Sequence, residues 1–325
     1  MGRAISRRSL GAALAAGALA RQAAAQSTDP ARIIVPFPPG AASDGIARLL
    51  AERMVRAGTW GSAVLTESRP GAGGNIAGAA AARARPDGRS FLLTIDSTLT
   101  VNPHLYPDLG YDPDALEPVA LMGTFAQVLL AHPSSGVSTL PEFLAAARGR
   151  GLAYASGGVG TPGQLAMEAF RLAAGLPATA LSHVPYRGSG PALTDLIAGN
   201  VPVGFLAISG APDFVRDGRV RAIAVSSAER LETLPAVPTV AELGFPGLDM
   251  EFANLLIAPK GIPAAARDEV AALAVAMLRE EPVRARFAMW NLSTRAGGPE
   301  EAGAWIARAR PRWGEVVRAT GMRAE

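Results

Sequence analysis

Glycine-rich turns that join short apolar runs to amphipathic helices constrain the fold of this chain more than any other feature. The first is Arg32-Ile-Ile-Val-Pro-Phe-Pro-Pro-Gly-Ala-Ala-Ser-Asp44, and a related one is Leu152-Ala-Tyr-Ala-Ser-Gly-Gly-Val-Gly-Thr-Pro-Gly-Gln164. In both, an apolar run of strand length ends at Pro or Gly and a helix pattern begins. Such a turn leaves backbone N–H groups unpaired at a helix N-terminus, where they can bind an anion.

Strand patterns alternate with helix patterns along the whole chain. The predicted strands are residues 33–37, 63–66, 91–95, 119–121, 127–131, 152–155, 182–184, 203–206, 222–225 and 255–258. Helix patterns between successive apolar strands predict βαβ units, and therefore an α/β protein with two mostly parallel sheets flanked by helices. Two long helices, around 264–279 and 299–320, complete the pattern.

The chain is long enough for two domains, because 325 residues can form two separate cores. The sequence lacks a low-complexity linker, which favours two lobes joined by crossing strands near Phe125 and Phe252. We expect residues 26–125 and 253–325 to form lobe 1, and residues 126–252 to form lobe 2. The C-terminal helices are then expected to pack on lobe 1.

Residues 1–25 have the pattern of an export signal. Three arginines precede an apolar run at 10–20, which is too short to span a bilayer. Ala23-Ala24-Ala25 provides a small-residue cleavage site, so the mature chain is predicted to begin at Gln26. Ser6-Arg7-Arg8-Ser9-Leu10 resembles a twin-arginine signal, and an ordinary secretory signal is the alternative.

Removal of that signal changes the charge balance. The full chain has 31 Lys and Arg against 28 Asp and Glu, whereas removing the four arginines of residues 1–25 leaves 27 basic groups. A net charge of about −1 gives no support to nucleic-acid binding. Mean hydropathy is +0.20, largely from alanine, so the mature chain is not expected to be embedded in a membrane.

Side-chain chemistry excludes several kinds of site. The sequence has no cysteine and only three widely spaced histidines, which excludes thiolate sites and argues against a histidine metal site. It has no G-x-S-x-G motif, and its only lysine, Lys260, is outside any Walker A pattern. We expect neither enzyme activity nor a bound cofactor or metal.

The first loop has the chemistry of an anion site. Gly40 allows a tight turn, and the N–H groups of Ala41, Ala42, Ser43 and Asp44 are expected to gather at the helix start. The alternative is that Ser43 or Asp44 merely caps the helix. Phe37 is a candidate cleft aromatic or a core residue, and the same two alternatives apply to Tyr186.

The second loop contains Gly158-Val-Gly160-Thr-Pro-Gly163, which matches the G-x-G-x-x-G pattern of dinucleotide sites. The ribose-binding acid expected about 20 residues later is missing, and Pro162 interrupts the pattern. An exported dinucleotide-dependent oxidoreductase is therefore a weaker alternative. His183, on a predicted strand, is interpreted as a packed or capping residue rather than a base.

Eight motifs occur in an order that resembles the Bug or TctC family of extracytoplasmic solute-binding proteins, over essentially the whole mature chain. They are Pro36-Phe-Pro-Pro-Gly-Ala-Ala-Ser-Asp44, Arg69-Pro-Gly-Ala-Gly-Gly-Asn75, Pro86-Asp-Gly88, Asn102-Pro-His-Leu-Tyr106, Val184-Pro-Tyr-Arg-Gly188, Pro191-Ala-Leu-Thr-Asp195, Val237-Pro-Thr-Val-Ala-Glu242 and Ala258-Pro-Lys-Gly261.

The resemblance implies a periplasmic-binding-protein-like fold, with two lobes around a cleft that binds a small carboxylate. It implies a monomer in the periplasm that serves the membrane subunits of a tripartite tricarboxylate transporter. A sensor that presents the ligand to a membrane signalling protein is the alternative. The ligand-binding residues that we expect are Phe37, Gly40, Ala41, Ala42, Ser43, Asp44, Ser97, Ser156, Gly157, Gly158, Thr161, Gln164, Tyr186 and Ala207.

The chain departs from the family pattern at three places. Ala41 replaces a common glycine, Gln164 stands where His is common, and Leu206-Ala207 replaces a frequent acidic or amide pair. Without that acid, the ammonium group of an amino acid would have no partner in a dry cleft. We therefore expect a plain mono- or dicarboxylate with a fairly apolar body.

Overall fold

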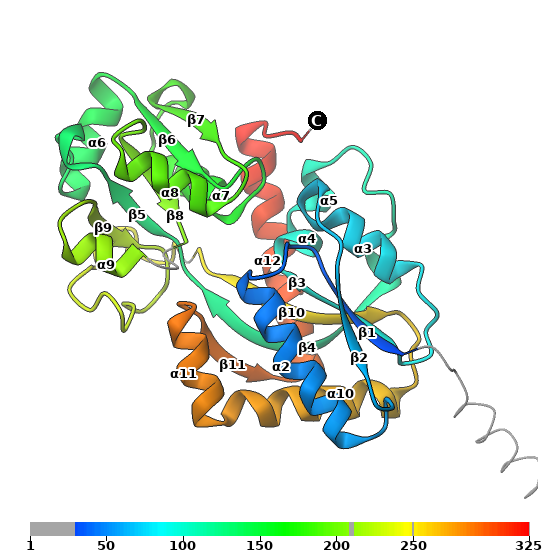
Figure 1. Cartoon of the computed structure of the whole chain (residues 1–325). Helices are drawn as coiled ribbons and strands as arrows, with labels where there is room; N and C mark the ends of the chain where they lie inside the picture. The colour runs from blue at the N-terminus through cyan, green and yellow to red at the C-terminus, as the bar shows by residue number, and fades with distance from the viewer. Residues whose placement is uncertain (1–29, 208–210, 249, 325) are drawn as a thin grey trace, which may run out of the picture.

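The computed structural model describes residues 30–207, 211–248 and 250–324 of the 325-residue chain. The predicted signal peptide, residues 1–25, lies outside the described residues. Within that part of the chain, the strands form two β-sheets, each flanked by helices (Figure 1). This is the expected α/β architecture.

The six-stranded sheet has the strand order β11-β4-β10-β3-β1-β2. Its strands are β1 (Ala31–Val35), β2 (Val64–Ser68), β3 (Ser90–Ile95), β4 (Leu116–Phe125), β10 (Phe252–Pro259) and β11 (Ser293–Gly297). The five-stranded sheet has the order β7-β6-β8-β5-β9. Its strands are β5 (Val128–Ala131), β6 (Leu152–Ser156), β7 (Leu181–Pro185), β8 (Val203–Leu206) and β9 (Arg221–Val225).

Both sheets are mixed, so the expectation of mostly parallel sheets is wrong. Strand β1 is parallel to β2 and β3, but β10 is antiparallel to both β3 and β4. In the other sheet β6 is parallel to its neighbours, whereas β5 is antiparallel to β8 and β9. In the six-stranded sheet the reason is that the chain leaves at the end of β4 and returns beside it at the start of β10, so the two strands run in opposite directions.

Helices cover both faces of the six-stranded sheet. Ile33 and Val35 of β1 pack towards α2 (Ala42–Ala57), α10 (Ala264–Arg279) and α11 (Glu281–Met289). Ile34 packs on the opposite face, with α3 (Asn75–Ala82), α4 (Ser97–Thr100) and the start of α12 (Pro299–Thr320). Successive strand residues point to opposite faces, which explains why this strand is apolar throughout.

The five-stranded sheet is covered in the same way. One core contains α6 (Leu140–Gly149) and α7 (Pro162–Ala173), and the other contains α8 (Ser189–Ile197). Helix α9 (Ala211–Arg216) lies beyond β8, α5 (Asn102–Leu105) follows α4, and short 3-10 turns occur at 72–74, 113–115, 133–135 and 178–180. A sequence pattern at 3.6-residue spacing produces each buried helix face.

The two sheets meet where β4 ends and β10 begins. Phe125 and Phe252 are paired residues of these strands, and their rings stack with centroids 5.9 Å apart. Beside them, Ser226 is fully buried and its Oγ accepts from the N–H of Gln127 at 2.8 Å. The same hydroxyl donates to the carbonyl of Met250 at 3.1 Å. One side chain thus holds both segments that pass between the sheets.

Helix α12 packs more widely than expected. Its first half contacts β4 and α4, as predicted for a C-terminal helix on lobe 1. Its second half contributes Trp313, Val316 and Val317 to the core that contains α7 (Figure 1). Trp313 also stacks on Phe252 with ring centroids 4.9 Å apart. Helix α12 therefore packs against both sheets, in addition to the expected packing on lobe 1.

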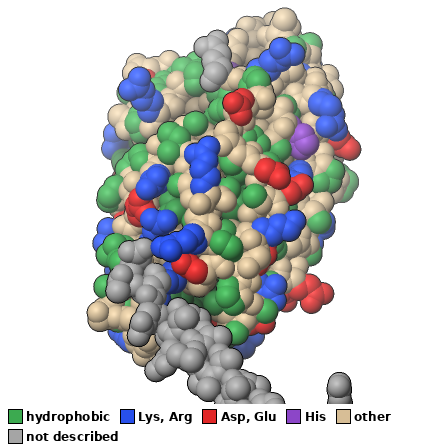
Figure 2. Space-filling model, turned by 90° about the vertical axis from the view of Figure 1, so that its right-hand side faces the viewer, with side chains coloured by type: hydrophobic (Ala, Val, Ile, Leu, Met, Phe, Trp, Pro, Cys, Tyr) green, Lys and Arg blue, Asp and Glu red, His purple; other side chains and the backbone are tan. Residues whose placement is uncertain are grey.

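Charged side chains of both signs are interspersed over the face that carries α3 and α5, with apolar side chains between them (Figure 2).

None of the helices described in residues 30–207, 211–248 and 250–324 has the length and apolar character needed to cross a bilayer.

Candidate functional site

The first loop lies between β1 and α2. One of its N–H groups donates to a side chain, and those at the start of α2 have no intrahelical acceptor. Asp44 turns back from the first turn of α2, so that its Oδ2 accepts from the N–H of Gly40 at 3.1 Å and from Arg48 Nε at 3.0 Å. Burial raises the pKa of this carboxyl, but the hydrogen bonds from Arg48 and Gly40 outweigh it, and the pKa lies below its usual value. Asp44 therefore stays ionised and holds the loop, rather than capping the helix amides.

The N-terminus of α2 remains available to an anion. Ala41 is the N-cap residue and has no side-chain oxygen with which to cap. The N–H groups of Ala42, Ser43 and Asp44 have no intrahelical acceptor, because they occupy the first turn. Unpaired N–H groups and the helix dipole are the features by which helix N-termini bind anions. Figure 1 shows this end of α2 facing the five-stranded sheet.

Asn254 is a site residue that sequence reasoning missed. It lies in β10 with 2% of its surface exposed, and Ser43 Oγ donates to its Oδ1 at 3.3 Å. The signal was present, since an asparagine interrupts the apolar run of residues 252–258. A polar residue in a central strand needs a partner, and here the partner comes from the first loop.

The loops after β1, β2 and β3 meet beside α2. A Cβ atom built at Gly74 would lie 2.7 Å from Thr98 Oγ1 and 3.5 Å from Pro36 Cβ, so only glycine fits there. Ser97, a predicted ligand-binding residue, is buried at the start of α4. Asn75 follows Gly74, and its Oδ1 accepts from Asn102 Nδ2 at 2.7 Å. These loops form one polar cluster at the carboxyl ends of the strands, where α/β proteins bind ligands.

The second loop, residues 156–161, is held by a hydrogen-bond network centred on His183 of β7. Ser156 Oγ lies 2.6 Å from His183 Nε2, and it accepts from the N–H of Gly158 at 3.1 Å. Gln164 Nε2 lies 3.1 Å from His183 Nδ1, while Gln164 Oε1 accepts from the N–H of Gly160 at 2.7 Å. The Oγ of Thr161 donates to the carbonyl of Gly158 at 2.7 Å.

This network determines the tautomer of His183. The N–H of Gly160 requires the oxygen of Gln164, so the amide nitrogen of Gln164 must face the imidazole. Nδ1 then accepts, and Nε2–H donates to Ser156. Burial lowers the pKa of His183 to about 4, against a smaller opposing effect of Glu168, so the ring is neutral near pH 7.

The Ser156–His183 pair consequently lacks the geometry of a nucleophile and its base. A general base must accept the hydroxyl proton, whereas Nε2 here already carries a hydrogen. The Oγ–H of Ser156 instead donates to the carbonyl of Gly158 at 3.1 Å. The pair is a structural contact, in agreement with the interpretation of His183 as a packed or capping residue rather than a base.

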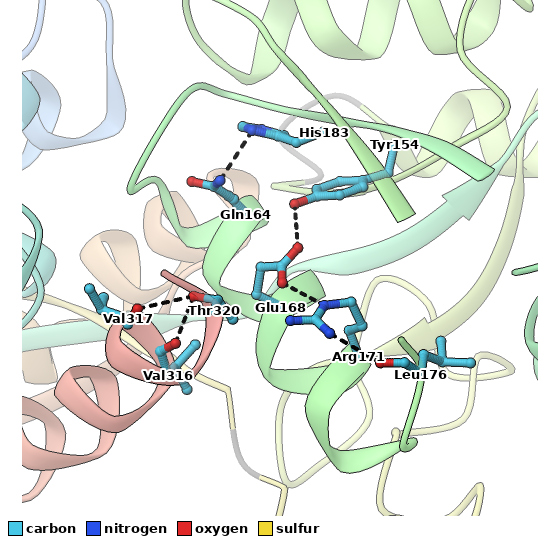
Figure 3. A network of polar contacts seen from close by, with 9 residues as sticks. All are labelled: Tyr154, Gln164, Glu168, Arg171, Leu176, His183, Val316, Val317 and Thr320. Carbon is cyan, nitrogen blue, oxygen red and sulfur yellow. Dashed lines mark hydrogen bonds and ion pairs between the residues drawn. The ribbon is translucent and has the colours of Figure 1, made fainter. Parts of the chain in front are cut away.

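A second polar layer lies beneath this network (Figure 3). Tyr154 stacks on His183 with ring centroids 5.0 Å apart, and its hydroxyl donates to Glu168 Oε1 at 2.9 Å. Glu168 Oε2 accepts from Arg171 Nε at 2.7 Å, and both side chains are buried. Burial and the neighbouring Glu168 raise the pKa of Tyr154, so its hydroxyl stays protonated.

The other predicted site residues lie around the two loops. Gly157 accepts at its carbonyl from the N–H of Gly188 at 3.0 Å, and Ala207 is half-buried just after β8. Phe37 packs partly against the core under α2. Tyr186 packs against the core under α8, and its hydroxyl donates to Asp195 at 2.8 Å. Both aromatics therefore make the contacts expected under the alternative interpretation, in which they are core residues rather than cleft residues.

The structure also has a hollow of about 430 Å³ between residues 227–233 and the α11–β11 segment, and one of about 500 Å³ beside β2. Neither is lined by the predicted site residues. Among the described residues, no group of three or more His, Cys, Asp or Glu side chains could hold a metal ion.

A model of the tripartite tricarboxylate transporter family receptor, TctC, matches residues 46–322 of the chain. The chain belongs to the TctC family. Protein BugT of Bordetella pertussis is 33% identical over 298 residues, a match that covers 90% of both chains. A UPF0065 protein of Pseudomonas sp., from the tcbD-tcbE intergenic region, is 34% identical over 290 residues, covering 87% of this chain and 84% of its own.

Solved structures confirm the fold of this TctC protein. R. palustris Rpa4515 with adipate has a TM-score of 0.80 at 27% identity, covering 91% of this chain and 99% of its own. MatC from Rhodopseudomonas palustris with bound malate has a TM-score of 0.77 at 28% identity, covering 90% of this chain and 100% of its own. The protein is thus a Bug/TctC-type solute-binding protein with a periplasmic-binding-protein fold, in a family of receptors rather than enzymes.

Proposed function

We propose that the protein captures a small carboxylate in the periplasm and delivers it to the membrane subunits of a tripartite tricarboxylate transporter. It acts as a monomer whose two lobes, residues 26–125 with 253–325 and residues 126–252, close on the ligand. The division of strands between the two sheets at Phe125 and Phe252 supports these lobes. Closure then follows from ligand contacts to both lobes, which favour the closed state.

The uncapped N-terminus of α2 is the observation that carries this proposal. Ala42 and Ser43 present amides there, while the carboxylate of Asp44 is bound by Gly40 and Arg48. A carboxylate can therefore bind these amides without displacing a capping side chain. The ligand-bound relatives, one with adipate and one with malate, support a carboxylate as the ligand.

A plain carboxylate with an apolar body fits better than an amino acid. Leu206 is fully buried and Ala207 follows it, so this segment offers no acid to an ammonium group. Val159, at the tip of the second loop, leaves 40% of its surface exposed. Apolar side chains at such positions favour the hydrocarbon part of a ligand.

Calorimetric titration with adipate, malate, aspartate and glutamate tests this proposal. We expect adipate or malate to bind and the two amino acids to bind at least about tenfold more weakly, because an unpaired buried ammonium is costly. Tight binding of aspartate or glutamate, with none of the plain dicarboxylates, would contradict the ligand class.

The Ala42→Pro variant tests the α2 site itself. Proline is tolerated at the first position of a helix, as at Pro162 of α7, and it removes one N–H. We expect the affinity for the carboxylate to fall about tenfold, the value of one charge-assisted hydrogen bond. Ala264→Pro, at the first position of α10, is the matched control and should leave the affinity unchanged. Equal affinities of the two variants would exclude this helix end as the binding site.

A further inference from the structure

We propose that His183 is a positioning residue, which sets the geometry of the second-lobe loop for ligand binding without touching the ligand. This inference rests on the proposed function, because it assigns a role to a residue behind the loop at residues 156–161. Its basis is the hydrogen-bond network, in which one ring connects the end of a strand to the start of a helix.

The register of the sheet places the ring. Strands β6 and β7 are parallel, and Tyr154 is the direct partner of His183. The two rings stack at an interplanar angle of 27°. Stacking sets the plane of the imidazole, so Nε2 reaches Ser156 at the end of β6 and Nδ1 reaches Gln164 in the first turn of α7. The rigid imidazole ring of His183 thereby sets the distance between the end of β6 and the start of α7.

Two amides of the loop donate to side chains that this ring contacts. Ser156 Oγ receives the N–H of Gly158, and Gln164 Oε1 receives the N–H of Gly160. Gly158 and Gly160 have φ angles of +129° and +71°, which glycine adopts freely. His183 holds both acceptors in place, and through them it restrains two glycines that would otherwise be mobile.

The outcome is a loop whose remaining amides are held ready to bind. With the N–H groups of Gly158 and Gly160 occupied, the amides of Gly157 and Val159 are donors that a ligand can use. Holding donors in the bound geometry improves affinity, since the ordering cost is not incurred at binding. Ser156 and Gln164 then act behind the loop, rather than as direct ligand contacts.

Three variants test this role. His183→Phe keeps an aromatic ring on Tyr154 and removes both hydrogen bonds, whereas His183→Gln retains an N–H for Ser156. Tyr154→Phe is the control, since it removes the hydroxyl that bonds to Glu168 and Gln164 beneath the ring, and leaves the hydrogen bonds of His183 and of the Gly158 and Gly160 amides in place. Measurements are amide hydrogen exchange of the ligand-free protein, melting temperature, and calorimetric titration with adipate and malate.

We expect His183→Phe to speed exchange at Gly158 and Gly160 and to weaken binding about tenfold, with His183→Gln restoring much of both. Tyr154→Phe should lower the melting temperature and leave affinity unchanged. If His183→Phe behaves like Tyr154→Phe, the role is only structural and the inference is wrong. Should His183→Phe not fold, Ser156→Ala, which breaks the link from His183 to Gly158, must speed exchange at Gly158 and weaken binding.

The same experiment separates this inference from the proposed function. A wild-type protein that binds none of the carboxylates overturns the function, and the exchange rates of Gly158 and Gly160 then decide the role of His183 by themselves. Binding by the wild type, with exchange and affinity unaltered in His183→Phe, overturns the positioning role and leaves the function standing.

Discussion

At the scale of single residues, Asp96 shows how the loop after β3 is joined to the C-terminal helix. It is fully buried between β3 and α4, and its Oδ2 accepts from Trp305 Nε1 of α12 at 2.7 Å. Its Oδ1 has no hydrogen-bond partner within the part of the chain that the structure describes. Burial is the dominant effect and raises the pKa of Asp96 to about 6, despite the bond from Trp305.

Asp96 should therefore make stability depend on pH. The unfolded residue ionises near pH 4, the folded one near pH 6, so between these values the folded state holds the extra proton. Its contribution to the free energy of unfolding is thus largest at low pH and falls as pH rises from about 4 to about 6. Asp96→Asn is neutral throughout, and its side-chain oxygen can still accept from Trp305.

We expect the stability of Asp96→Asn relative to wild type to rise over that pH range and to level off above about pH 7. Urea unfolding of both proteins at several pH values measures the difference, and other titrating groups cancel. A stability difference that stays constant with pH would show that Asp96 ionises normally in the folded protein.

At the scale of elements, the close contact of α7 with β8 shapes the second loop. A Cβ atom at Gly163 would lie 2.2 Å from the carbonyl oxygen of Phe205, which is a backbone atom and cannot turn aside. Glycine at the second position of α7 is thus required by helix–strand packing rather than by a positive φ. The G-x-G-x-x-G match of the sequence has this physical origin, and a nucleotide is not needed to explain its last glycine.

Gly163→Ala should push α7 away from β8 and lower the free energy of unfolding by about 1–3 kcal/mol, the usual cost of overpacking. Gly190→Ala is the matched control, since Gly190 is also the second residue of a helix and a Cβ there has no described atom within 4 Å. It should be neutral or stabilising by up to about 1 kcal/mol. Chemical denaturation of both variants measures this, and equal effects would contradict the packing argument.

At the scale of the whole molecule, three of the connections within the described residues restrict how the two sheets can move. Two are the segments held by Ser226, whose hydroxyl contacts both Gln127 and Met250. The third is α12, which shares cores with both sheets through Trp305 and Trp313. If the two lobes close, the chain must bend at these connections, because the packed cores on either side resist deformation.

Ser226→Ala should destabilise the protein by about 1–3 kcal/mol, because it leaves the buried N–H of Gln127 without its acceptor. Ser227→Ala is the control, since the neighbouring hydroxyl donates only to Glu229 within its own loop at 2.7 Å. Its effect should stay below about 1 kcal/mol. Urea unfolding would distinguish them, and a loss as large for Ser227→Ala would argue against a specific role of Ser226.

Much of the architecture follows from local pattern. The first strand, predicted at 33–37 and observed at 31–35, and the helices after Ala41 and Thr161 were predictable, because hydrophobic period and turn residues act over a few positions. Strand direction was not, since β10 pairs with β3 across about 160 residues of chain and nothing local specifies its orientation.

The candidate site, like the fold, was only partly predictable from the sequence. That the first and second loops would end strands and begin helices was evident from Gly40 and Gly158, because glycine and proline determine such turns locally. The partners were not evident: Ser43 meets Asn254 across 211 positions, and Ser156 meets His183 across 27. Whether Asp44 would block the helix end or bind the loop also depended on where its carboxylate finally pointed.

By itself, the sequence therefore determined the α/β class, the turns that can hold an anion and the family, since all three depend on residue order over short spans. Only the tertiary structure decided the mixed sheets, the reach of α12 and the network around His183. Those features depend on side chains and strands that meet from distant parts of the chain, where packing and hydrogen bonding select one arrangement among many.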